Sequence, residues 1–367
     1  MRLVRFVPFR KAALSGSLRK LLLIGACGAL LFAAGCGSRK PTPTASPVPS
    51  SVGPSKAPTA EPTAAQIPVA AFRAPLTGLP TADESSGRAF LFTVENSPAA
   101  RPQTGLDQAD LVYEVLAEGE ITRFLAVYQS GHPAVIGPVR SMRPYFAEIG
   151  VGLDAVLVHA GWSQDGMNMM VKLHADHMDG VYADGAVFWR STDRKAPHNL
   201  YTSWEKVMQG FERHKFRAEW KDPGLTFAAP GESVASGSAE WLAAEAVTIP
   251  YILGYRVGYR YDAASGVYMR FMDGEPHKDK ESGKQLSAAN VIVMEASHKV
   301  LDQAGRRDVN VNSSGNGYLI QQGMERKVTW SRKDGVIRVF ADGRELPLVP
   351  GKTWVQIVPT GTVPVFS

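Results

Sequence analysis

A loop at residues 136–146 carries the first group of side chains that could do chemistry. It holds Arg140, Ser141 and Arg143, and Pro144 stands where the first position of a helix is expected. Free backbone N–H groups at a helix start attract anions, and guanidinium groups bind phosphate or carboxylate as a fork. The spacing therefore predicts an anion site. The alternative is that both arginines pair with acidic residues of neighbouring segments: Asp110, Glu114 or Glu118.

A second loop, residues 189–199, combines cations with side chains that can both donate and accept hydrogen bonds. Arg190, Arg194 and Lys195 supply the charge, and His198 and Asn199 follow a proline that restricts the backbone. Ligand sites need a few convergent polar groups of this kind. We therefore assign Arg190, Arg194, His198 and Asn199 to the same anion site, and a solvated charged loop is the alternative.

A third loop, residues 159–166, follows a strongly apolar predicted strand, and ligands collect at such strand ends in open sheets. His159 could act as a base, and Ser163 as a nucleophile or a binding hydroxyl. Neither lies in a Gly-x-Ser-x-Gly turn, which argues against a serine hydrolase. The alternative for His159 is a hydrogen-bonded histidine of the core.

His174 and His177 stand three residues apart, a spacing that can place two metal ligands on one helix face. They lack the His-Glu-x-x-His pattern, and Gly180 close by favours an exposed helix end instead. We predict no metal site and no cofactor. Aromatic residues of the second half could form a sugar-binding face or cross-strand core pairs, and strand spacing favours the pairs: Tyr255, Tyr259, Tyr261, Tyr268, Trp330 and Trp354.

The elements that must position these loops alternate between strands and short helices over residues 75–230. Runs rich in Val, Leu and aromatic residues predict strands at residues 90–95, 110–116, 121–129 and 155–160. Helices are predicted at residues 144–151 and 165–173, and a third runs to Arg213 from a capping box of Thr202 and Glu205. We expect a mixed-sheet α/β domain.

A polar stretch at residues 228–238 predicts a boundary, and residues 240–367 then read as a mostly β domain. Dipeptides typical of tight turns punctuate it: Asp273-Gly274, Asp334-Gly335 and Asp342-Gly343. Strands are predicted at residues 247–251, 255–261, 267–272, 290–296, 317–321, 326–331, 336–340 and 353–358. The fold class of the whole chain is therefore α+β.

The first residues have the organisation of a lipoprotein signal peptide, residues 1–35. Six basic and no acidic residues precede an apolar run at residues 21–34, which is shorter than the about 20 residues of a spanning helix. The small residues Ala33-Ala34-Gly35 resemble a lipobox and predict lipidation of Cys36. Cys27 is a rival, but only residues 21–23 would then form the apolar core. Residues 36–74, rich in Pro, Thr, Ser and Ala, predict a disordered stalk.

Charge and cysteine content exclude several classes of function. The formal net charge is +5, and six basic residues belong to the predicted leader, which leaves +5 − 6 = −1 for the mature chain. Nucleic-acid binding thus has no global electrostatic support. The chain has two cysteines, Cys27 and Cys36. Cleavage before Cys36 leaves the folded region without a disulfide, a thiolate metal site or a cysteine nucleophile.

The chain resembles the YerB-like lipoproteins over nearly everything after the stalk. The resemblance rests on these residues of the first domain: Pro75-Leu76-Thr77-Gly78-Leu79, Glu95-Asn96, residues 101–106, Asp110, Thr122-Arg123, residues 137–141 and residues 196–199. In the second domain it rests on residues 290–293, Ser314-Gly315 and residues 350–354. Val328-Thr329-Trp330 departs from the usual Gly-Thr-Trp. The resemblance implies an α+β first domain, a β-rich second domain and an extracytoplasmic location, and no established reaction.

Three loops that each follow a strand predict one solvent-accessible cleft in the first domain, with Arg140, Arg143, Arg190 and His198 as its binding core. We expect a lipid-anchored binding or scaffold protein on the extracytoplasmic face of the cell membrane. Its partner would be an anionic cell-wall glycan or a peptidoglycan-synthesis protein. The alternative is an envelope glycan phosphotransferase or hydrolase that uses the same residues, for which the sequence shows no complete catalytic set.

Overall fold

The structure is a computed structural model that describes residues 72–84, 87–234, 240–251 and 254–367. The predicted signal peptide, Cys36 and most of the predicted stalk lie outside the described residues. The last residues of the predicted stalk are described, and they form a strand: β1 (Phe72–Arg73) pairs antiparallel with β2 (Pro80–Thr81). The guanidinium of Arg73 also donates to the Gly78 carbonyl at 3.0 Å.

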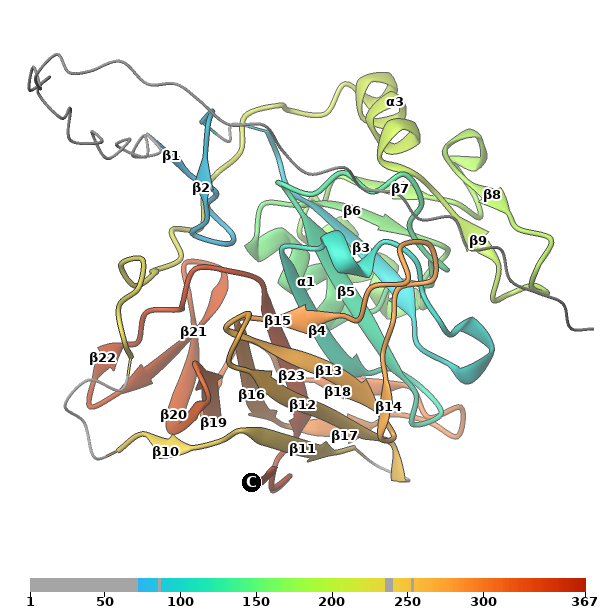
Figure 1. Cartoon of the computed structure of the whole chain (residues 1–367). Coiled ribbons are helices and arrows are strands. Elements are labelled where there is room, and N and C mark those ends of the chain that lie inside the picture. The colour runs from blue at the N-terminus through green and yellow to red at the C-terminus, as the bar shows by residue number, and fades with distance from the viewer. Residues whose placement is uncertain (1–71, 85–86, 235–239, 252–253) are drawn as a thin grey trace, which may run out of the picture. The chain divides into compact units, whose positions relative to one another are not determined.

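One large sheet of 12 strands runs through the molecule (Figure 1). Its strand order is β22-β21-β20-β19-β16-β23-β4-β5-β3-β6-β7, and β10 pairs with β20. The strands of the N-terminal half are β3 (Phe90–Glu95), β4 (Leu111–Leu116), β5 (Thr122–Tyr128), β6 (Val156–His159) and β7 (His177–Asp179). Those of the C-terminal half are β10 (Leu242–Ala243), β16 (Asn290–Ala296), β19 (Ser314–Gln321), β20 (Met324–Lys333), β21 (Val336–Ala341), β22 (Arg344–Glu345) and β23 (Thr353–Pro359).

Strand β23 joins the two halves of the sequence into one sheet. It pairs in parallel with β16 on one side and with β4 on the other, where Thr353 is opposite Leu111. The segments predicted as two domains therefore share their hydrogen-bonded backbone. Local patterns of residues could not show this contact, because more than 200 residues separate β4 from β23.

The central strands are buried on both faces, which explains their nearly continuous apolar sequences. Every residue of β3, β4 and β5 is buried. Phe92 and its alternate neighbours pack with Val207 and Phe211 and with the second sheet, while Leu91 packs with Phe146 on the opposite face. The large sheet thus has one core on each side.

A second sheet of six strands covers one face of the large sheet, in the order β14-β13-β12-β11-β24 with β15 on β13. Its strands are β11 (Ala246–Pro250), β12 (Arg256–Asp262), β13 (Val267–Met272), β14 (Glu275–Pro276), β15 (Ser287–Ala288) and β24 (Val365–Phe366). The three predicted Asp-Gly turns are confirmed. Both residues of each turn have positive φ, as in the turn β13–β14, where Asp273 has 50° and Gly274 has 92°.

Three helices cover the N-terminal half of the sheet: α1 (Pro144–Gly152), α2 (Gln164–Lys172) and α3 (Trp204–His214). Helices α1 and α2 pack on one face, and α3 packs on the other. The predicted capping box was wrong by one residue. Ser203 caps α3 and accepts a hydrogen bond from the Lys206 backbone at 3.1 Å, whereas the Thr202 hydroxyl donates to the Val187 carbonyl at 2.8 Å.

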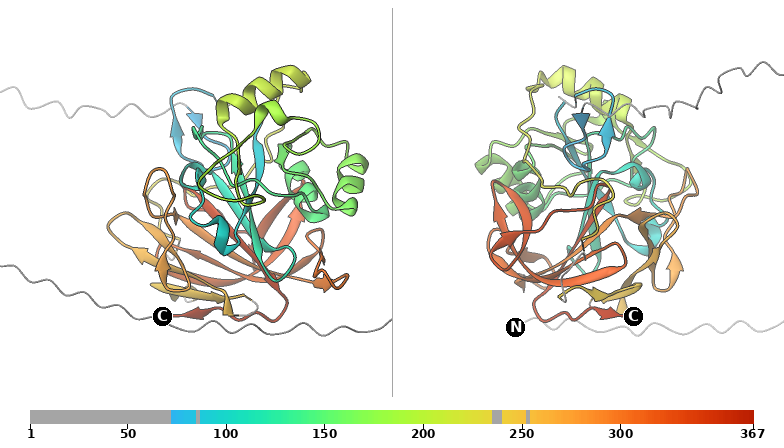
Figure 2. Two further views of the ribbon diagram at one scale, coloured as in Figure 1. Left: turned by 90° about the vertical axis from the view of Figure 1, so that its right-hand side faces the viewer. Right: turned by 60° about the vertical axis from the view of Figure 1, so that its left-hand side comes forward.

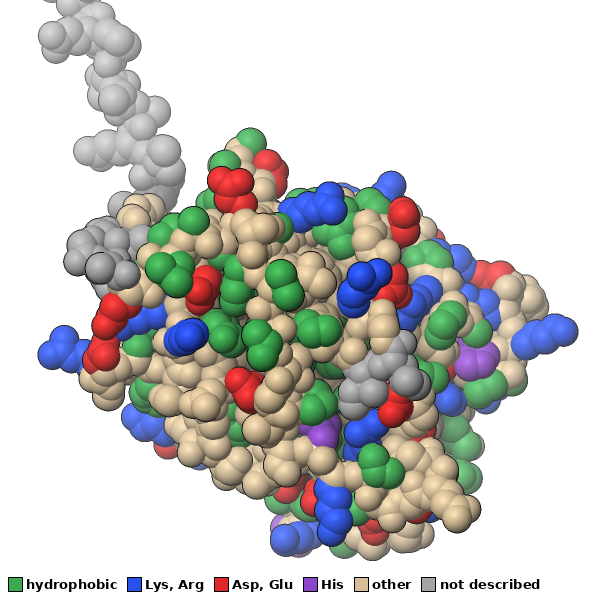
Figure 3. All heavy atoms as spheres, turned by 90° about the horizontal axis from the view of Figure 1, so that it is seen from below, with side chains coloured by type: hydrophobic (Ala, Val, Ile, Leu, Met, Phe, Trp, Pro, Cys, Tyr) green, Lys and Arg blue, Asp and Glu red, His purple; other side chains and the backbone are tan. Residues whose placement is uncertain are grey.

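Short elements complete the described fold: 3-10 turns at Pro98–Ala100, Leu106–Gln108 and Gly185–Val187, the pair β8 (Trp189–Arg190) and β9 (Leu200–Tyr201), and the pair β17 (His298–Val300) and β18 (Arg307–Val309). The predicted α+β class, with a mixed sheet followed by a mostly β region, is confirmed. Of the helices in the described residues, none has the length and apolarity needed to cross a membrane. On the face seen in Figure 3, basic and acidic side chains are interspersed with apolar ones.

Candidate functional site

Backbone hydrogen bonds join the three loops singled out in the sequence alongside the last residues of β3. Arg140 donates its N–H to the Thr93 carbonyl at 2.8 Å, and Val139 donates to Leu200 at 2.7 Å. Met142 donates to the Gly161 carbonyl at 2.9 Å. The loop at residues 136–146 thus lies against β3, against the third loop and against the end of the second loop.

The carboxylate of Glu95, the last residue of β3, is the centre of this region. Its Oε1 accepts hydrogen bonds from the Ser97 hydroxyl at 2.7 Å and from Nδ1 of His198 at 2.8 Å. Nε of Arg140 lies 3.3 Å from Oε2. We name Glu95, Ser97, Arg140 and His198 the Glu95 site. Two residues of the predicted binding core, Arg140 and His198, therefore contact the same carboxylate.

The outer atoms of the Glu95 site are open to a ligand. The Glu95 side chain is 4% exposed, whereas those of Arg140 and His198 are 23% and 28% exposed. Because the Glu95 carboxylate accepts a hydrogen bond from Nδ1 of His198, that nitrogen carries a proton. Nε2, the other ring nitrogen, does not contact Glu95. Neither Nε2 of His198 nor the Nη groups of Arg140 form a hydrogen bond with another described residue.

Two buried atoms of the Glu95 site also lack a well-aligned partner. Oε2 of Glu95 and Nε of Arg140 are closed to solvent, and neither makes a hydrogen bond within the described part of the chain, although they lie 3.3 Å apart. Nearly all buried polar atoms in native proteins are hydrogen-bonded, and exceptions often mark functional positions. A ligand that shifts Arg140 slightly could align this pair.

A second layer of arginines lies behind the Glu95 site. The Glu118 carboxylate forms an ion pair with Arg123 and accepts a hydrogen bond from Nε of Arg143 at 2.9 Å. Burial alone would raise the pKa of Glu118, but Arg123 and Arg143 outweigh it and hold that pKa below its ordinary value. Burial, with Arg143 next and Arg140 also acting, lowers the pKa of Arg123 to about 10. Three guanidinium groups thus crowd around two carboxylates, Glu95 and Glu118.

Arg143 was predicted to lie in an accessible cleft, but in the structure it is buried. Arg143 is 7% exposed, and its other guanidinium nitrogens donate to Glu118 at 2.5 Å and to the Met142 carbonyl at 2.6 Å. The alternative of pairing with a neighbouring carboxylate applies here. Since burial makes an unpaired guanidinium costly, Glu118 holds Arg143 inside the fold.

The predicted serines have structural contacts. Ser163 is the N-cap of α2, and its hydroxyl accepts a hydrogen bond from the Gly166 backbone at 3.1 Å. The Ser141 carbonyl accepts from Arg123 at 3.0 Å. These bonds give Ser163 a capping role and fix the backbone beside Arg140.

The second loop is held together by Asn199. Its amide oxygen accepts from Arg190 at 2.9 Å, and its amide nitrogen donates to the carbonyls of Ser191 at 2.8 Å and Arg194 at 3.1 Å. Arg194 also donates to the Pro102 carbonyl at 2.7 Å and to the Tyr201 hydroxyl. Of the predicted site residues in this loop, Arg190 is exposed, Arg194 and His198 are half-buried, and Asn199 is buried.

His159, at the start of the third loop, pairs with His177 of β7, away from the Glu95 site. His159 is 0% exposed, with Nδ1 3.0 Å from the Gly161 carbonyl and Nε2 3.1 Å from Nδ1 of His177. Burial and then His177 lower the pKa of His159 to about 3. The interpretation of His159 as a core histidine is confirmed. Within the described ranges there is no group of three metal-ligating side chains, and His174 has a left-handed backbone with φ of 50°.

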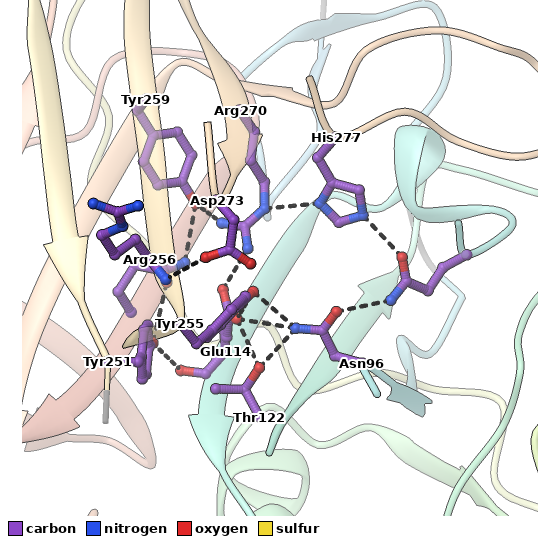
Figure 4. A network of polar contacts seen from close by, with 12 residues as sticks. Asn96, Glu114, Thr122, Tyr251, Tyr255, Arg256, Tyr259, Arg270, Asp273 and His277 are labelled. Carbon is purple, nitrogen blue, oxygen red and sulfur yellow. Dashed lines mark hydrogen bonds and ion pairs between the residues drawn. The ribbon is translucent and has the colours of Figure 1, made fainter. Parts of the chain in front are cut away.

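A buried polar network supports the Glu95 site from the other face of the sheet (Figure 4). Asn96, the next residue, donates to Thr122 at 2.7 Å and to the Tyr255 hydroxyl at 2.9 Å. Tyr255 in turn donates to Glu114 at 2.8 Å, and Arg270 binds the second oxygen of Glu114 at 2.6 Å. The network joins β4 to β13 and fixes the end of β3.

The aromatic residues predicted as core pairs have that role. Tyr259, Tyr268, Trp330 and Trp354 are 0–2% exposed. The guanidinium carbon of Arg270 lies 4.3 Å from the ring centroid of Trp354 and 5.3 Å from that of Tyr259. The rings of Trp354 and Tyr259 therefore enclose a buried cation, and all four rings are too deeply buried to present a sugar-binding face.

Sequence reasoning did not identify Glu95, Ser97 and Arg123 as site residues. A signal was present, because Glu95-Asn96 and Thr122-Arg123 stand at the ends of two predicted strands and belong to the residues that carry the family resemblance. Charged residues at the end of an apolar strand are candidates for a site. The pairing of Glu95 with Arg123 across β3 and β5 required the register of the sheet.

The chain matches two family models, and both are described as a protein of unknown function (DUF3048). The N-terminal domain matches residues 76–217 and the C-terminal domain residues 247–355. The chain is 40% identical over 292 residues to "Putative lipoprotein YerB" of Bacillus subtilis (strain 168), covering 78% of this chain and 86% of that protein. The crystal structure of YerB from Bacillus subtilis matches with a TM-score of 0.73 at 38% identity, over 81% of this chain and 99% of that one.

Proposed function

The chain belongs to the two-domain YerB-like family, and from this premise we propose that it is a lipid-anchored protein of the cell envelope that binds an anionic ligand at the Glu95 site. Cys36 carries the lipid in this proposal, and residues 36–71 connect it to the folded region on the extracytoplasmic face. The lipoprotein named among the relatives supports the anchor.

A single observation carries the proposed binding role. Arg140 and His198 come from different loops and both contact Glu95. The Nη groups of Arg140 and Nε2 of His198 make no hydrogen bond with described residues. Arg123 and Arg143 share the Glu118 carboxylate, so these three residues together add one net positive charge next to the Glu95 site. The free guanidinium donors of Arg140 bind phosphate or carboxylate oxygens with charge-assisted hydrogen bonds, and Nε2 of His198 can donate to such a ligand only when both ring nitrogens carry a proton.

The carboxylate of Glu95 limits the kind of ligand. It repels an anion that approaches closely, so we infer that a phosphate or carboxylate group contacts the outer edge of Arg140 and His198 and does not replace Glu95. In the envelope the candidates are a phosphate-linked glycan or teichoic-type polymer, a lipid-linked precursor, or a stem-peptide carboxylate. A peptidoglycan-synthesis protein with an acidic surface is the corresponding protein partner.

Calorimetric titration of the full-length protein with poly(glycerol phosphate) tests this proposal. Arg140→Gln removes donors that together are worth about one to two charged hydrogen bonds, so we expect an affinity about tenfold or more lower. Arg344→Gln is the matched control. It removes the same charge from the exposed strand β22 at the opposite edge of the sheet, and should leave binding unchanged. Equal effects of both variants would reject a specific site.

A second candidate, a phosphotransferase or hydrolase acting on envelope glycans, is favoured by the geometry of His198. Its Nδ1 lies 2.8 Å from Glu95 Oε1, an arrangement that orients an imidazole so that Nε2 can act as a general base. A phosphodiester substrate with a chromogenic leaving group distinguishes the two roles. Turnover that His198→Gln abolishes while poly(glycerol phosphate) binding persists would favour the enzyme, and no turnover at all would favour binding alone.

A further inference from the structure

A cavity of about 540 Å³ lies at the opposite end of β3 from the Glu95 site, where the strand begins at Phe90. Its walls come from the segment after β2, from the end of β5 and from α3. Figure 2 shows α3 and the hairpin β1–β2 side by side in both views. The volume is in the range of sites that enclose a small ligand or a long side chain.

One wall of the cavity is aromatic. Trp204 and Phe211 of α3 line it together with Phe90, and the Phe90 ring centroid lies 5.1 Å from that of Trp204 and 5.7 Å from that of Phe211. His132 stacks on Trp204 with a centroid distance of 4.3 Å, and Met208 adds a flexible thioether. This wall can pack against methylene groups and can bind a cation on its ring faces.

The charges around the cavity are mainly negative. Asp83, Glu84 and Glu212 line it, and their carboxylates make no ion pair or side-chain hydrogen bond with other described residues. Arg88 is the basic residue of the lining, but it binds Asp176 and donates from Nε to the Asp154 carbonyl at 3.1 Å. Its charge is therefore already neutralised, and the three carboxylates are left to a ligand.

A buried acceptor without a partner stands in the same wall. Gln129 lines the cavity and is 9% exposed, and its amide oxygen has no hydrogen bond within the described residues. The amide nitrogen makes only a long bond, 3.3 Å, to the Gly87 carbonyl. A ligand donor that forms a hydrogen bond with this buried acceptor would therefore stabilise the complex.

We propose that this cavity binds a peptide through a long aliphatic side chain that ends in an ammonium group. The methylene groups would pack on Trp204 and Phe211, the ammonium group would be balanced by Asp83 and Glu212, and Gln129 offers an acceptor to the peptide or its amine. An anionic ligand is disfavoured because the carboxylates repel it. The Glu95 site and this cavity thus take ligands of opposite charge at the two ends of one strand.

The test is calorimetric titration of the full-length protein with the tripeptide Ala-Lys-Ala and with its Nε-acetylated form. We expect acetylation to weaken binding about tenfold or more, because it removes the charge that the carboxylates and the aromatic rings recognise. Glu212→Gln should weaken binding of the unmodified peptide about threefold or more. Glu205→Gln is the control, since Glu205 is exposed on the same helix and does not line the cavity.

Arg140→Gln should leave this peptide binding unchanged, which separates the inference from the proposed anion site. Equal binding of both peptides, no binding of either, or stronger binding of a neutral disaccharide would overturn the proposal. Equal effects of Glu212→Gln and Glu205→Gln would also overturn it, since a general loss of negative charge would then explain the result. Glu212 is exposed, so its substitution should not unfold the protein.

Discussion

Replacing Arg270 by methionine should destabilise the protein strongly, because the change leaves the Glu114 carboxylate buried without its cation. Both side chains are 0% exposed, and Nη2 of Arg270 lies 2.6 Å from Oε2 of Glu114. Burial alone would lower the pKa of Arg270, but Glu114 outweighs it and raises that pKa. Breaking a buried pair of this kind typically costs about 3 to 5 kcal/mol.

The expected loss is large compared with the about 5 to 15 kcal/mol by which a folded domain exceeds its unfolded state. We expect Tm to fall by about 6 °C or more for Arg270→Met. Glu114→Gln should also be costly, since it leaves the Arg270 guanidinium in the core without a counter-ion. The double variant Glu114→Gln with Arg270→Met leaves no buried charge, so it should cost about 1.5 kcal/mol or more less than the sum of the two single variants.

Urea unfolding followed by far-ultraviolet circular dichroism measures these differences. The matched control is Arg306→Met, which breaks an exposed pair with Asp302 at 2.5 Å and should cost less than about 1 kcal/mol. Because Glu114 is in β4 and Arg270 is in β13, the two halves of the chain should still unfold in one transition in the wild type. The reasoning is refuted if Arg270→Met costs no more than Arg306→Met, or if the two single losses simply add.

Three further predictions follow from other parts of the molecule. The pKa of His159 is about 3 in the fold and about 6.5 when unfolded, so the unfolded state binds more protons than the folded state between those two values. The free energy of unfolding should therefore be highest above pH 6.5 and about 2 kcal/mol lower at pH 5, and thermal unfolding at pH 7 and pH 5 should show a smaller difference for His159→Gln. Gly152→Ala should destabilise by about 1 to 3 kcal/mol, because an added Cβ would lie 1.9 Å from the Gly335 carbonyl oxygen, whereas Gly185→Ala meets nothing within 4 Å and should be nearly neutral in the same urea assay. Cys36→Ser should prevent lipid attachment and processing, and a mutant that mass spectrometry found processed and lipidated would contradict the assignment of Cys36.

Local sequence patterns were sufficient for most strands and turns. β3, β13 and β16 have the predicted bounds, since alternating or continuous apolar residues flanked by turn residues leave few other choices. The turn at Asp334-Gly335 was also predictable, because both residues need positive φ. The parallel pairing of β23 with β4 was not predictable, because it depends on a long-range contact that no local pattern encodes.

The site was predictable only in part. The cationic density of two loops identified Arg140 and His198, but the same density also included Arg143, which pairs with Glu118. Choosing between these roles requires the position of each carboxylate, and that depends on sheet register. Glu95 and Arg123 face each other across β3 and β5, a contact between strands that are separated by a long connection. The sequence therefore indicated the charge of the site more reliably than the partners of each residue.

The most direct test of the anion site is a two-dimensional NMR spectrum of the histidine ring nitrogens during titration with poly(glycerol phosphate). We predict that the Nε2 resonance of His198, assigned with His198→Gln, shifts as the polymer binds, while Nδ1 keeps its bond to Glu95. The resonances of His159 should not move, because this ring is 0% exposed, and neutral dextran should have no effect. Polymer binding without a shift at His198 Nε2, or the same shift with dextran, would contradict the proposed site.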